Sequence, residues 1–192
     1  MSLVRESVVV TLDAAGRPHP APLGVIERPP HLVLAPFRPS RTLDHLEARP
    51  FATVNYVDDV RIFAGCVTGR RRDWSVVPAE RIPGFRLEAA LAHSEVEVVA
   101  VEPDPLRPRF LAREVHFASH RPFLGLNRAR HAVLEGAILI SRLHLLPRGE
   151  VEAAFRRLRV LVEKTAGPAE REAWAWLEEA LARAPADRAG AP

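Results

Sequence analysis

Short runs of β-branched and alternating apolar residues, separated by turn signals, fill the first two thirds of the chain. The run at residues 6–12 (ESVVVTL) predicts a strand, and the turn that ends at Gly16 leads into a returning strand. Six or seven such strands with hairpin-like turns are typical of a small antiparallel barrel. The strands are expected over residues 6–12, 19–26, 31–35, 51–57, 85–92, 95–102 and 110–117.

Apolar residues return at helical spacing in the last third of the chain. A helix is expected from the N-cap residue Asn127 to about residue 143, followed by one over residues 151–162 that ends before Gly167. Pro168 opens a third helix, because proline suits the first helical position. The last two helices are separated by a short connection and are predicted to form an antiparallel hairpin.

Two short helices are also expected within the strand region, one after Pro36 and one capped by Asp58-Asp59. The predicted fold class is therefore α+β, mainly β. A barrel domain spans residues 1–145, and the helical hairpin spans residues 146–185 and packs on the barrel or on a partner chain. The Ala/Pro-rich end, residues 186–192, is expected to be a flexible tail.

Composition places the chain among ordinary globular proteins. Its 192 residues are 47% hydrophobic and 27% charged, which suits one domain with an appended helical piece. The sequence has no run of about 18 apolar residues and no signal-peptide pattern, so we expect no membrane span. Cys66 is the only cysteine, which excludes an intramolecular disulfide. A cytoplasmic location follows as the prediction.

The basic character of the chain comes from arginine. The net charge is only +3, and Lys164 is the sole lysine. The one dense basic cluster, Arg70 to Arg72, covers three residues, whereas a nucleic-acid surface shows a broader basic stripe with aromatic residues. We therefore predict a solvated loop there and no nucleic-acid partner.

The stretch FRPSRTLDHL, residues 37–46, carries a candidate phosphate cradle. Ser40 or Thr42 can cap the short helix, whose first amides and dipole favour an anion. Arg38 and Arg41 add guanidinium groups that match phosphate oxygens. The alternative is a capped surface helix with two solvated arginines.

Two prolines distinguish the second strand. Pro20 and Pro22 have no amide donor, so the ladder is open on one side, as in an edge strand. Beside a ligand, the amides of Ala21, Leu23 and Gly24 can instead face a planar group, and Gly24 permits close backbone approach.

Further polar residues are candidates for a site. Asn55 is an amide inside an apolar strand and requires partners. Arg128 and Arg130 lie in the first turn of a helix, where a positive charge opposes the dipole, so one of the two is there for an anion or both belong to a plain capped helix. His116 and His120 stand four apart, but in a strand that spacing separates them by about 13 Å, so no metal site is expected.

No GxGxxG, GxxxxGK[ST] or GxSxG motif occurs. The segments ESVVVTLDAAGRPHPAPLGV, APFRPSRTLDHL, FATVNYVDDVRIF and NRARHAVLEGAILISRL instead resemble the DUF447 family of FMN-binding split barrels. That family is similar to the pyridoxamine-phosphate-oxidase-like and flavoredoxin-like flavoproteins. The resemblance covers residues 5–145 and implies an antiparallel split β-barrel.

The resemblance also implies a homodimer with FMN at or near the subunit interface. Residues of the second strand would line the isoalloxazine, and Asn55 would sit behind the flavin edge. Ser40-Arg41-Thr42 matches a Ser-Arg-Lys stretch that binds the FMN phosphate, with Thr42 in place of lysine and Arg38 or Arg128 restoring the charge. The lining residues implied are Ala21, Leu23, Gly24 and Val25, with Thr11 nearby.

By this resemblance the protein is a flavin-dependent oxidoreductase or flavin reductase. Hydride would pass between FMN and a small substrate or a nicotinamide, and no catalytic acid or base is identified. The family is linked to tetrahydromethanopterin-related, that is pterin-dependent, one-carbon metabolism. The alternative is a non-catalytic module that holds FMN or another anionic ligand as a carrier, sensor or assembly partner, which the loss of a lysine at Thr42 favours.

Overall fold

The structure is a computed structural model that describes residues 3–185, so the predicted tail at 186–192 lies outside the described residues. It comprises two compact units, residues 3–58 with 73–123 and residues 59–72 with 124–185. The elements in chain order are β1 (Val4–Leu12), β2 (Pro18–Arg28), β3 (His31–Leu34), α1 (Arg41–Ala48), β4 (Phe51–Tyr56), α2 (Arg61–Thr68), β5 (Val76–Pro78), β6 (Phe85–Leu87), β7 (Ala92–Glu102), β8 (Arg109–Ser119), α3 (Arg128–Ser141), α4 (Arg148–Thr165) and α5 (Pro168–Arg183).

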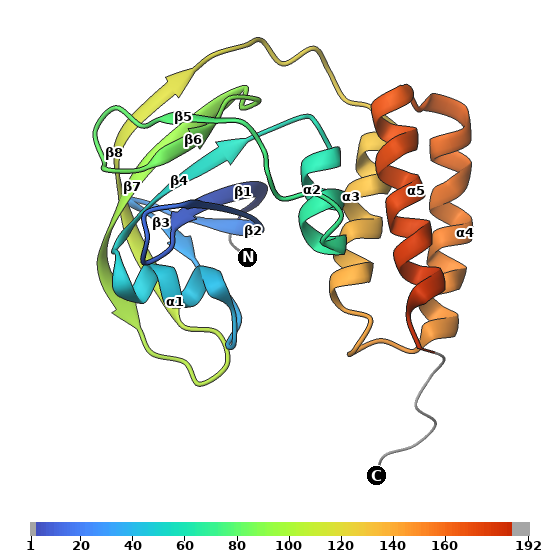
Figure 1. Cartoon of the computed structure of the whole chain (residues 1–192), viewed down its shortest axis with the longest axis horizontal. Helices are drawn as coiled ribbons and strands as arrows, with labels where there is room; N and C mark the ends of the chain where they lie inside the picture. The colour runs from blue at the N-terminus through green and yellow to red at the C-terminus, as the bar shows by residue number, and fades with distance from the viewer. Residues whose placement is uncertain (1–2, 186–192) are drawn as a thin grey trace. The chain divides into compact units, whose positions relative to one another are not determined.

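The first unit is a closed antiparallel barrel with strand order β1-β2-β3-β8-β7-β4 (Figure 1). The predicted α+β, mainly β class and the antiparallel barrel are confirmed. β1 and β2 pair along their whole length, from Val4 opposite Ile26 to Leu12 opposite Pro18. β2 and β3 pair only from Ile26 to Arg28. Residues 18–25 of β2 therefore have a strand on one edge alone within the described barrel.

Alternating side chains of the strands fill the barrel interior, because successive residues of a strand point to opposite faces. Helix α1 closes one end, where Leu43 and Leu46 reach the same core and are 0% and 1% exposed. A fully buried leucine contributes roughly 1.5–3 kcal/mol of transfer free energy, so this contact fixes the position of α1. The strand residues of the core are Val9, Val25, Leu34, Ala52, Val54, Val96, Phe110 and Ala112.

A two-stranded hairpin, β5 with β6, lies against the outer face of the barrel. Thr53 of β4 donates from Oγ1 to the carbonyl oxygen of Phe85 at 2.7 Å, which attaches β6 to that face. The prediction of one strand over residues 85–92 was wrong in extent, because β6 ends at Leu87 and β7 begins at Ala92. The intervening residues form a turn, in which the N–H of Ala90 donates to the Leu87 carbonyl at 3.2 Å.

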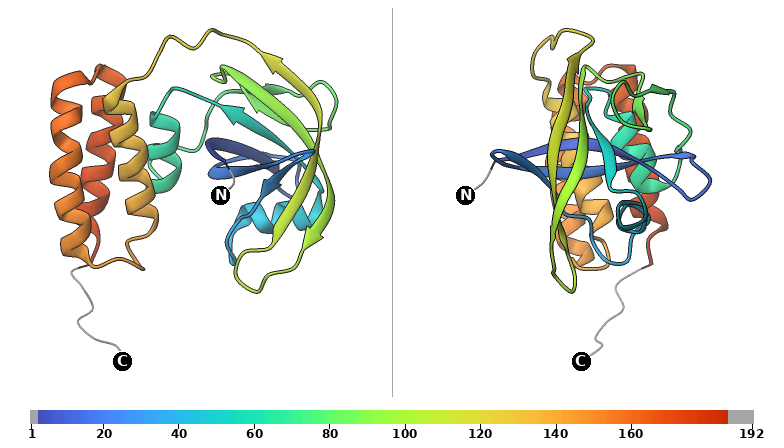
Figure 2. Two further views of the ribbon diagram at one scale, coloured as in Figure 1. Left: turned by 180° about the vertical axis from the view of Figure 1, so that it is seen from behind. Right: turned by 90° about the vertical axis from the view of Figure 1, so that its left-hand side faces the viewer.

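The second unit is all helical, with α3 in contact with α2, α4 and α5 (Figure 2). Gly136 lets α3 approach α5 closely, because a Cβ there would lie 3.1 Å from both Trp174 and Leu177. The rings of Trp174 and Phe155 of α4 have centroids 4.9 Å apart. The predicted domain boundary at residue 145 therefore differs from the structure, where α2 and α3 share a core with the C-terminal helices.

Two local predictions change in the helices. The N-cap of α2 is Val60 rather than Asp58-Asp59, although Asp59 Oδ1 accepts from the N–H of Arg61 at 3.1 Å. Asn127 caps α3 as expected, since its Oδ1 accepts from the N–H groups of Ala129 and Arg130. Among the helices that the structure describes, none is both long and apolar enough to span a bilayer. The cytoplasmic location stays a prediction.

Candidate functional site

The predicted phosphate cradle lies at the first turn of α1. Ser40 is the N-cap, and its Oγ accepts from the N–H of Leu43 at 3.3 Å, as one of the two predicted caps. The N–H groups of Arg41 and Thr42 belong to the helix start, where no carbonyl of the helix is in reach. No acceptor for them is present among residues 3–185. The arrangement provides two amide donors and the positive end of a helix dipole for an anion.

Arginine residues belong to this helix start or to the segments that meet just before it. Arg41 is exposed, and the described part of the chain provides no hydrogen bond or ion pair for its guanidinium. Arg38 instead pairs with Glu47 at 2.8 Å, so part of its charge is already compensated. The structure brings in Arg107 from the β7–β8 hairpin, whose guanidinium lies 4.6 Å from the ring centroid of Phe37. The cradle therefore has one uncompensated arginine from each of two segments far apart in sequence.

Arg107 was missed by sequence reasoning because it is remote from the cradle in the chain. Its Nε donates to the carbonyl oxygen of Ala35 at 2.7 Å, and the N–H of Arg38 donates to the Leu106 carbonyl at 2.8 Å. These two bonds join the hairpin tip to the segment that precedes α1. Only strand pairing between β3 and β8 places the two segments together.

Thr11 lies beneath the same helix, inside the barrel. It is 1% exposed, and its Oγ1 is 2.9 Å from Nδ1 of His45 in α1. Burial lowers the pKa of His45, with the charge of Asp13 and Asp44 acting in the opposite direction. Thr11 thus holds α1 against β1, and its predicted place near a flavin stays a prediction.

On β2, the predicted flavin-lining residues separate by exposure. Ala21, Leu23 and Gly24 are partly exposed on the strand that has one unpaired edge, whereas Val25 is buried in the core. Gly24 has a packing reason to be glycine, since a Cβ there would lie 2.9 Å from Cγ1 of Val4. The glycine therefore makes room for a side chain of β1, and its predicted approach to a ligand stays a prediction.

Asn55 has a full set of partners within the protein. It is 0% exposed, and its Nδ2 donates to the Val8 carbonyl at 3.0 Å and to Oγ1 of Thr53 at 3.0 Å. Its Oδ1 accepts from the N–H of Leu87 at 2.8 Å. Strand and hairpin groups thus provide the partners that this buried amide was predicted to require. Its contact with a flavin edge stays a prediction.

Arg128 lies in the helical unit. It is the first residue of α3 and is exposed, next to the cap made by Asn127. The cradle residues belong to the barrel unit. The role of Arg128 toward a phosphate therefore stays a prediction.

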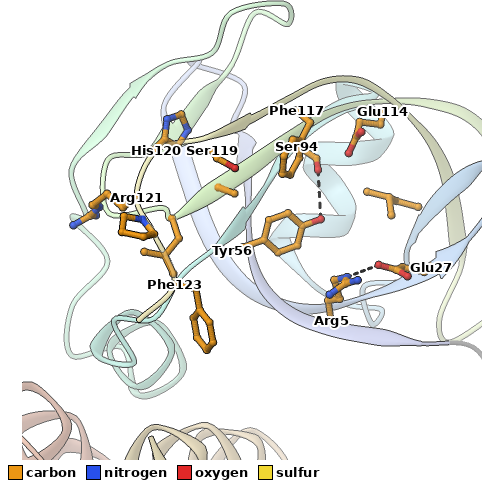
Figure 3. Close-up of a pocket in the computed structure, with 14 residues that line it drawn as sticks. Arg5, Glu27, Tyr56, Ser94, Glu114, Phe117, Ser119, His120, Arg121 and Phe123 are labelled. Carbon is orange, nitrogen blue, oxygen red and sulfur yellow. Dashed lines mark hydrogen bonds and ion pairs between the residues drawn. The ribbon is translucent and has the colours of Figure 1, made fainter. Parts of the chain in front are cut away.

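A pocket of about 990 Å³ opens at the end of the barrel opposite α1 (Figure 3). The strand registers place Arg5, Tyr56 and Ser119 at this end, whereas Leu12 and Phe51 lie at the α1 end. The lining residues are Arg5, Glu27, Leu32, Tyr56, Leu91, Ala92, Ser94, Glu114, Phe117, Ser119, His120, Arg121, Pro122 and Phe123.

The pocket combines an aromatic lining with a few polar groups. Tyr56 points inward, with its hydroxyl 3.4 Å from Oγ of Ser94 (Figure 3). Arg5 and Glu27 form an ion pair at the rim. Concave sites with aromatic walls and a few polar groups suit small organic ligands. Sequence reasoning missed this site because its residues come from all parts of the barrel and share no motif.

The chain belongs to the DUF447 family. Residues 5–121 match the N-terminal domain of this family, described as a protein of unknown function (DUF447), and residues 127–179 match a second DUF447 domain. The family assigned from sequence is confirmed. No curated protein matches the chain.

Solved structures share the fold. The FMN-bound DUF447 protein MM1853 from Methanosarcina mazei is 19% identical, with 92% of this chain and 94% of that chain covered and a TM-score of 0.80. Flavoredoxin from Methanosarcina acetivorans is 19% identical over 64% and 72% of the two chains, with a TM-score of 0.53. The NADH:FAD oxidoreductase SgcE6 from Streptomyces globisporus is 14% identical over 62% and 77%, with a TM-score of 0.52. At these identities the likeness establishes the fold.

Proposed function

We propose that this protein binds FMN and acts as a flavin-dependent oxidoreductase or flavin reductase on a small molecule. One observation carries the proposal: a structure of the same family that holds FMN matches 92% of the chain with a TM-score of 0.80. NADH:FAD oxidoreductase and flavoredoxin structures, which share the barrel, support the redox class.

The donors of the cradle suit a phosphate monoester. The N–H groups of Arg41 and Thr42 and the guanidinium of Arg41 provide donors at the helix start, and Arg107 adds positive charge beside them. We assign the FMN phosphate to these residues. The partly exposed β2 residues, Ala21 and Leu23, would lie along the ring system, with one strand edge unpaired for contact.

The chemistry supplied by bound FMN is hydride transfer. The residues of the chain would bind and orient the cofactor: the cradle holds the phosphate, and β2 gives the ring a flat, apolar support. We further propose a homodimer with FMN at or near the interface. Apolar side chains exposed on the barrel unit, such as Val99 and Val101 at 48% and 50%, support a subunit contact.

The test compares FMN binding by Arg41→Ala with binding by Arg113→Ala, an exposed arginine of β8 that pairs with Glu97. We expect the purified protein to show oxidised-flavin absorption bands and to release FMN on denaturation. Loss of a charge-assisted hydrogen bond costs about 1.5–3 kcal/mol, so Arg41→Ala should weaken FMN binding about tenfold to a hundredfold. Arg113→Ala should bind as the unmodified protein does. If both variants bind FMN with equal affinity, the assignment of the FMN phosphate to the cradle is wrong.

The barrel-mouth pocket is the competing location for the flavin. Phe117 lines it and is 53% exposed, so Phe117→Ser should leave the fold intact. If FMN binding is lost in Phe117→Ser and kept in Arg41→Ala, the flavin lies at the barrel mouth. The opposite result supports the cradle.

A non-catalytic FMN carrier is the second candidate. The ion pair between Arg38 and Glu47 compensates one arginine of the cradle, and Thr42 stands where the family resemblance implies a lysine. Reduced nicotinamide supplied with an electron acceptor separates the two functions. Steady turnover by the FMN-loaded protein supports the oxidoreductase, and binding without turnover supports the carrier.

A further inference from the structure

Histidine and glutamate side chains gather on the outer face of β7 and β8, away from the core. His93 and Glu95 stand two apart on β7, so they point to the same face, and His116 of β8 is directly opposite Glu95. One ligand atom from each of the three lies within 4.8 Å of the others. Small shifts of the side chains therefore suffice to bring all three onto one ion.

Glu95 is buried as a carboxylate. It is 0% exposed, and its oxygens accept from the N–H groups of Glu80, Arg81 and Ile82 at 2.6, 2.7 and 3.0 Å. Three backbone donors thus converge on its two oxygens and hold the carboxyl group in place beside His93 and His116.

His116 brings an unused nitrogen to the cluster. Its Nε2 is buried and has no hydrogen-bond partner among the described residues. Oε1 of Glu80 lies 3.5 Å from this nitrogen, beyond good hydrogen-bond distance. A buried ring nitrogen without a partner is costly unless something else satisfies it.

Two of the separations are close to those between ligands of a tetrahedral zinc ion. Zn–N and Zn–O bonds of about 2.0–2.2 Å at tetrahedral angles place neighbouring ligand atoms roughly 3.3–3.5 Å apart. His93 Nε2 and Glu95 Oε1 are 3.2 Å apart, and His116 Nε2 and Glu80 Oε1 are 3.5 Å apart. Two imidazoles and two carboxylates form a ligand set that zinc accepts.

His120 contacts His93 on the side of the ring away from Glu95. Its Nε2 lies 3.0 Å from Nδ1 of His93, and the two rings stack with centroids 5.0 Å apart. Ligating histidines are commonly oriented by a partner on the second ring nitrogen. If Nδ1 of His93 carries the proton and donates to His120, then Nε2 presents its lone pair to the ion.

We propose that His93, Glu95 and His116 form a binding site for a divalent transition metal of the zinc type, which the exposed carboxylate of Glu80, beside His116, completes. The ion would join the loop at residues 80–82 to β7 and β8 and so hold the β5–β6 hairpin on the barrel. The site lies within the barrel unit and does not depend on the proposed flavin chemistry. The sequence pair His116 and His120 contributes one ligand and one orienting residue, and the carboxylates come from other segments.

The experiment uses the tag-free, full-length protein after treatment with a chelator. Zn²⁺ is titrated by calorimetry, and Co²⁺ is added as a coloured probe of tetrahedral geometry. We expect one Zn²⁺ per chain, intense visible Co²⁺ bands and a higher midpoint of thermal unfolding with Zn²⁺, since an ion that binds only the folded state stabilises it. Absence of stoichiometric Zn²⁺ binding would overturn the proposal.

Variants locate the site. His120→Ala should weaken Zn²⁺ binding about 10- to 100-fold, as is usual when the partner of a ligating histidine is removed. His116→Ala should weaken it more, and Glu80→Gln serves if His116→Ala does not fold, because the Glu80 side chain is 60% exposed. His144→Ala, an exposed histidine of the helical unit, is the matched control. Zn²⁺ binding by Glu80→Gln and His116→Ala equal to that of the control would contradict the site.

Discussion

Oδ1 of Asn55 accepts a hydrogen bond from the backbone N–H of Leu87 at 2.8 Å, which ties β4 of the barrel to β6 of the outer hairpin. The amide nitrogen of the same side chain donates to the Val8 carbonyl of β1 at 3.0 Å. One buried side chain thus joins three strands, two of the barrel and one of the hairpin. Asn55 therefore has a structural task whether or not a flavin binds nearby.

Asn55→Leu is expected to destabilise the protein by about 2–4 kcal/mol. The substitution keeps the number and branching of the side-chain heavy atoms but removes the acceptor of the Leu87 N–H and a donor to the Val8 carbonyl, and a buried group left without its partner costs about 1–3 kcal/mol. The measurement is chemical denaturation without added flavin. An unchanged free energy of unfolding together with weakened FMN binding would instead assign the residue to the cofactor.

Glu170 is expected to stabilise the helical unit by about 1–3 kcal/mol. Its carboxylate accepts from Nε of Arg130 at 3.0 Å and from the N–H of Gly167 at 3.0 Å, so it joins the start of α5 to the start of α3. Glu170→Gln keeps the shape and removes the charge. Chemical denaturation at pH 7 should show a lower free energy of unfolding for Glu170→Gln. Glu163→Gln, at an exposed position of α4, should show little change.

The contribution of Glu170 should depend on pH. Burial raises its pKa, but the hydrogen bonds with Arg130 and Gly167 lower it further, so the net shift is downward. A lowered pKa means that the stabilisation is full above the ordinary value of about 4.3 and disappears as the pH falls through the folded-state value. The difference in free energy of unfolding between the unmodified protein and Glu170→Gln should therefore become smaller below about pH 4. A constant difference down to acid pH would show that the charge is not responsible.

Gly136 is expected to tolerate no branched side chain. Gly136→Val would press into Trp174 and Leu177 and cost about 1–3 kcal/mol or more. Gly136→Ala should be close to neutral, because the gain in helix propensity of about 1 kcal/mol is offset by the 3.1 Å contacts. Gly149→Ala is the control, since a Cβ there has nothing within 4 Å, and it should stabilise α4 by up to about 1 kcal/mol. Equal stabilisation at both glycines would refute the close helix contact.

His45 should make the barrel less stable in mild acid. Burial lowers its pKa, so between the folded-state value and about 6.5 the unfolded chain binds more protons. Stability therefore rises with pH across this window and is lost as the pH falls through it. The midpoint of thermal unfolding should change less between pH 5 and pH 7 in His45→Gln than in His144→Gln, a substitution at an exposed position. Parallel profiles for the two variants would contradict this assignment.

Local patterns were sufficient for most elements and for the family. The β-branched run of β1, the Ser40 cap and the Asn127 cap lie where the sequence predicts them, because strand alternation and helix capping depend on neighbours in the chain. The hairpin over residues 76–87 was not predicted as such. Its two strands are three residues each, and they depend on bonds to Thr53 and Asn55.

The candidate sites depended on tertiary structure to different degrees. The sequence by itself determined the capped helix start at Ser40 and Arg41, because the cap and its arginine are neighbours in the chain. Only strand pairing brought Arg107 beside Ala35 and Phe37, which precede that helix, opened the pocket at the other barrel end, and placed Glu95 opposite His116. These arrangements join residues that are distant in the chain, and the order and register of the strands decide which of them meet.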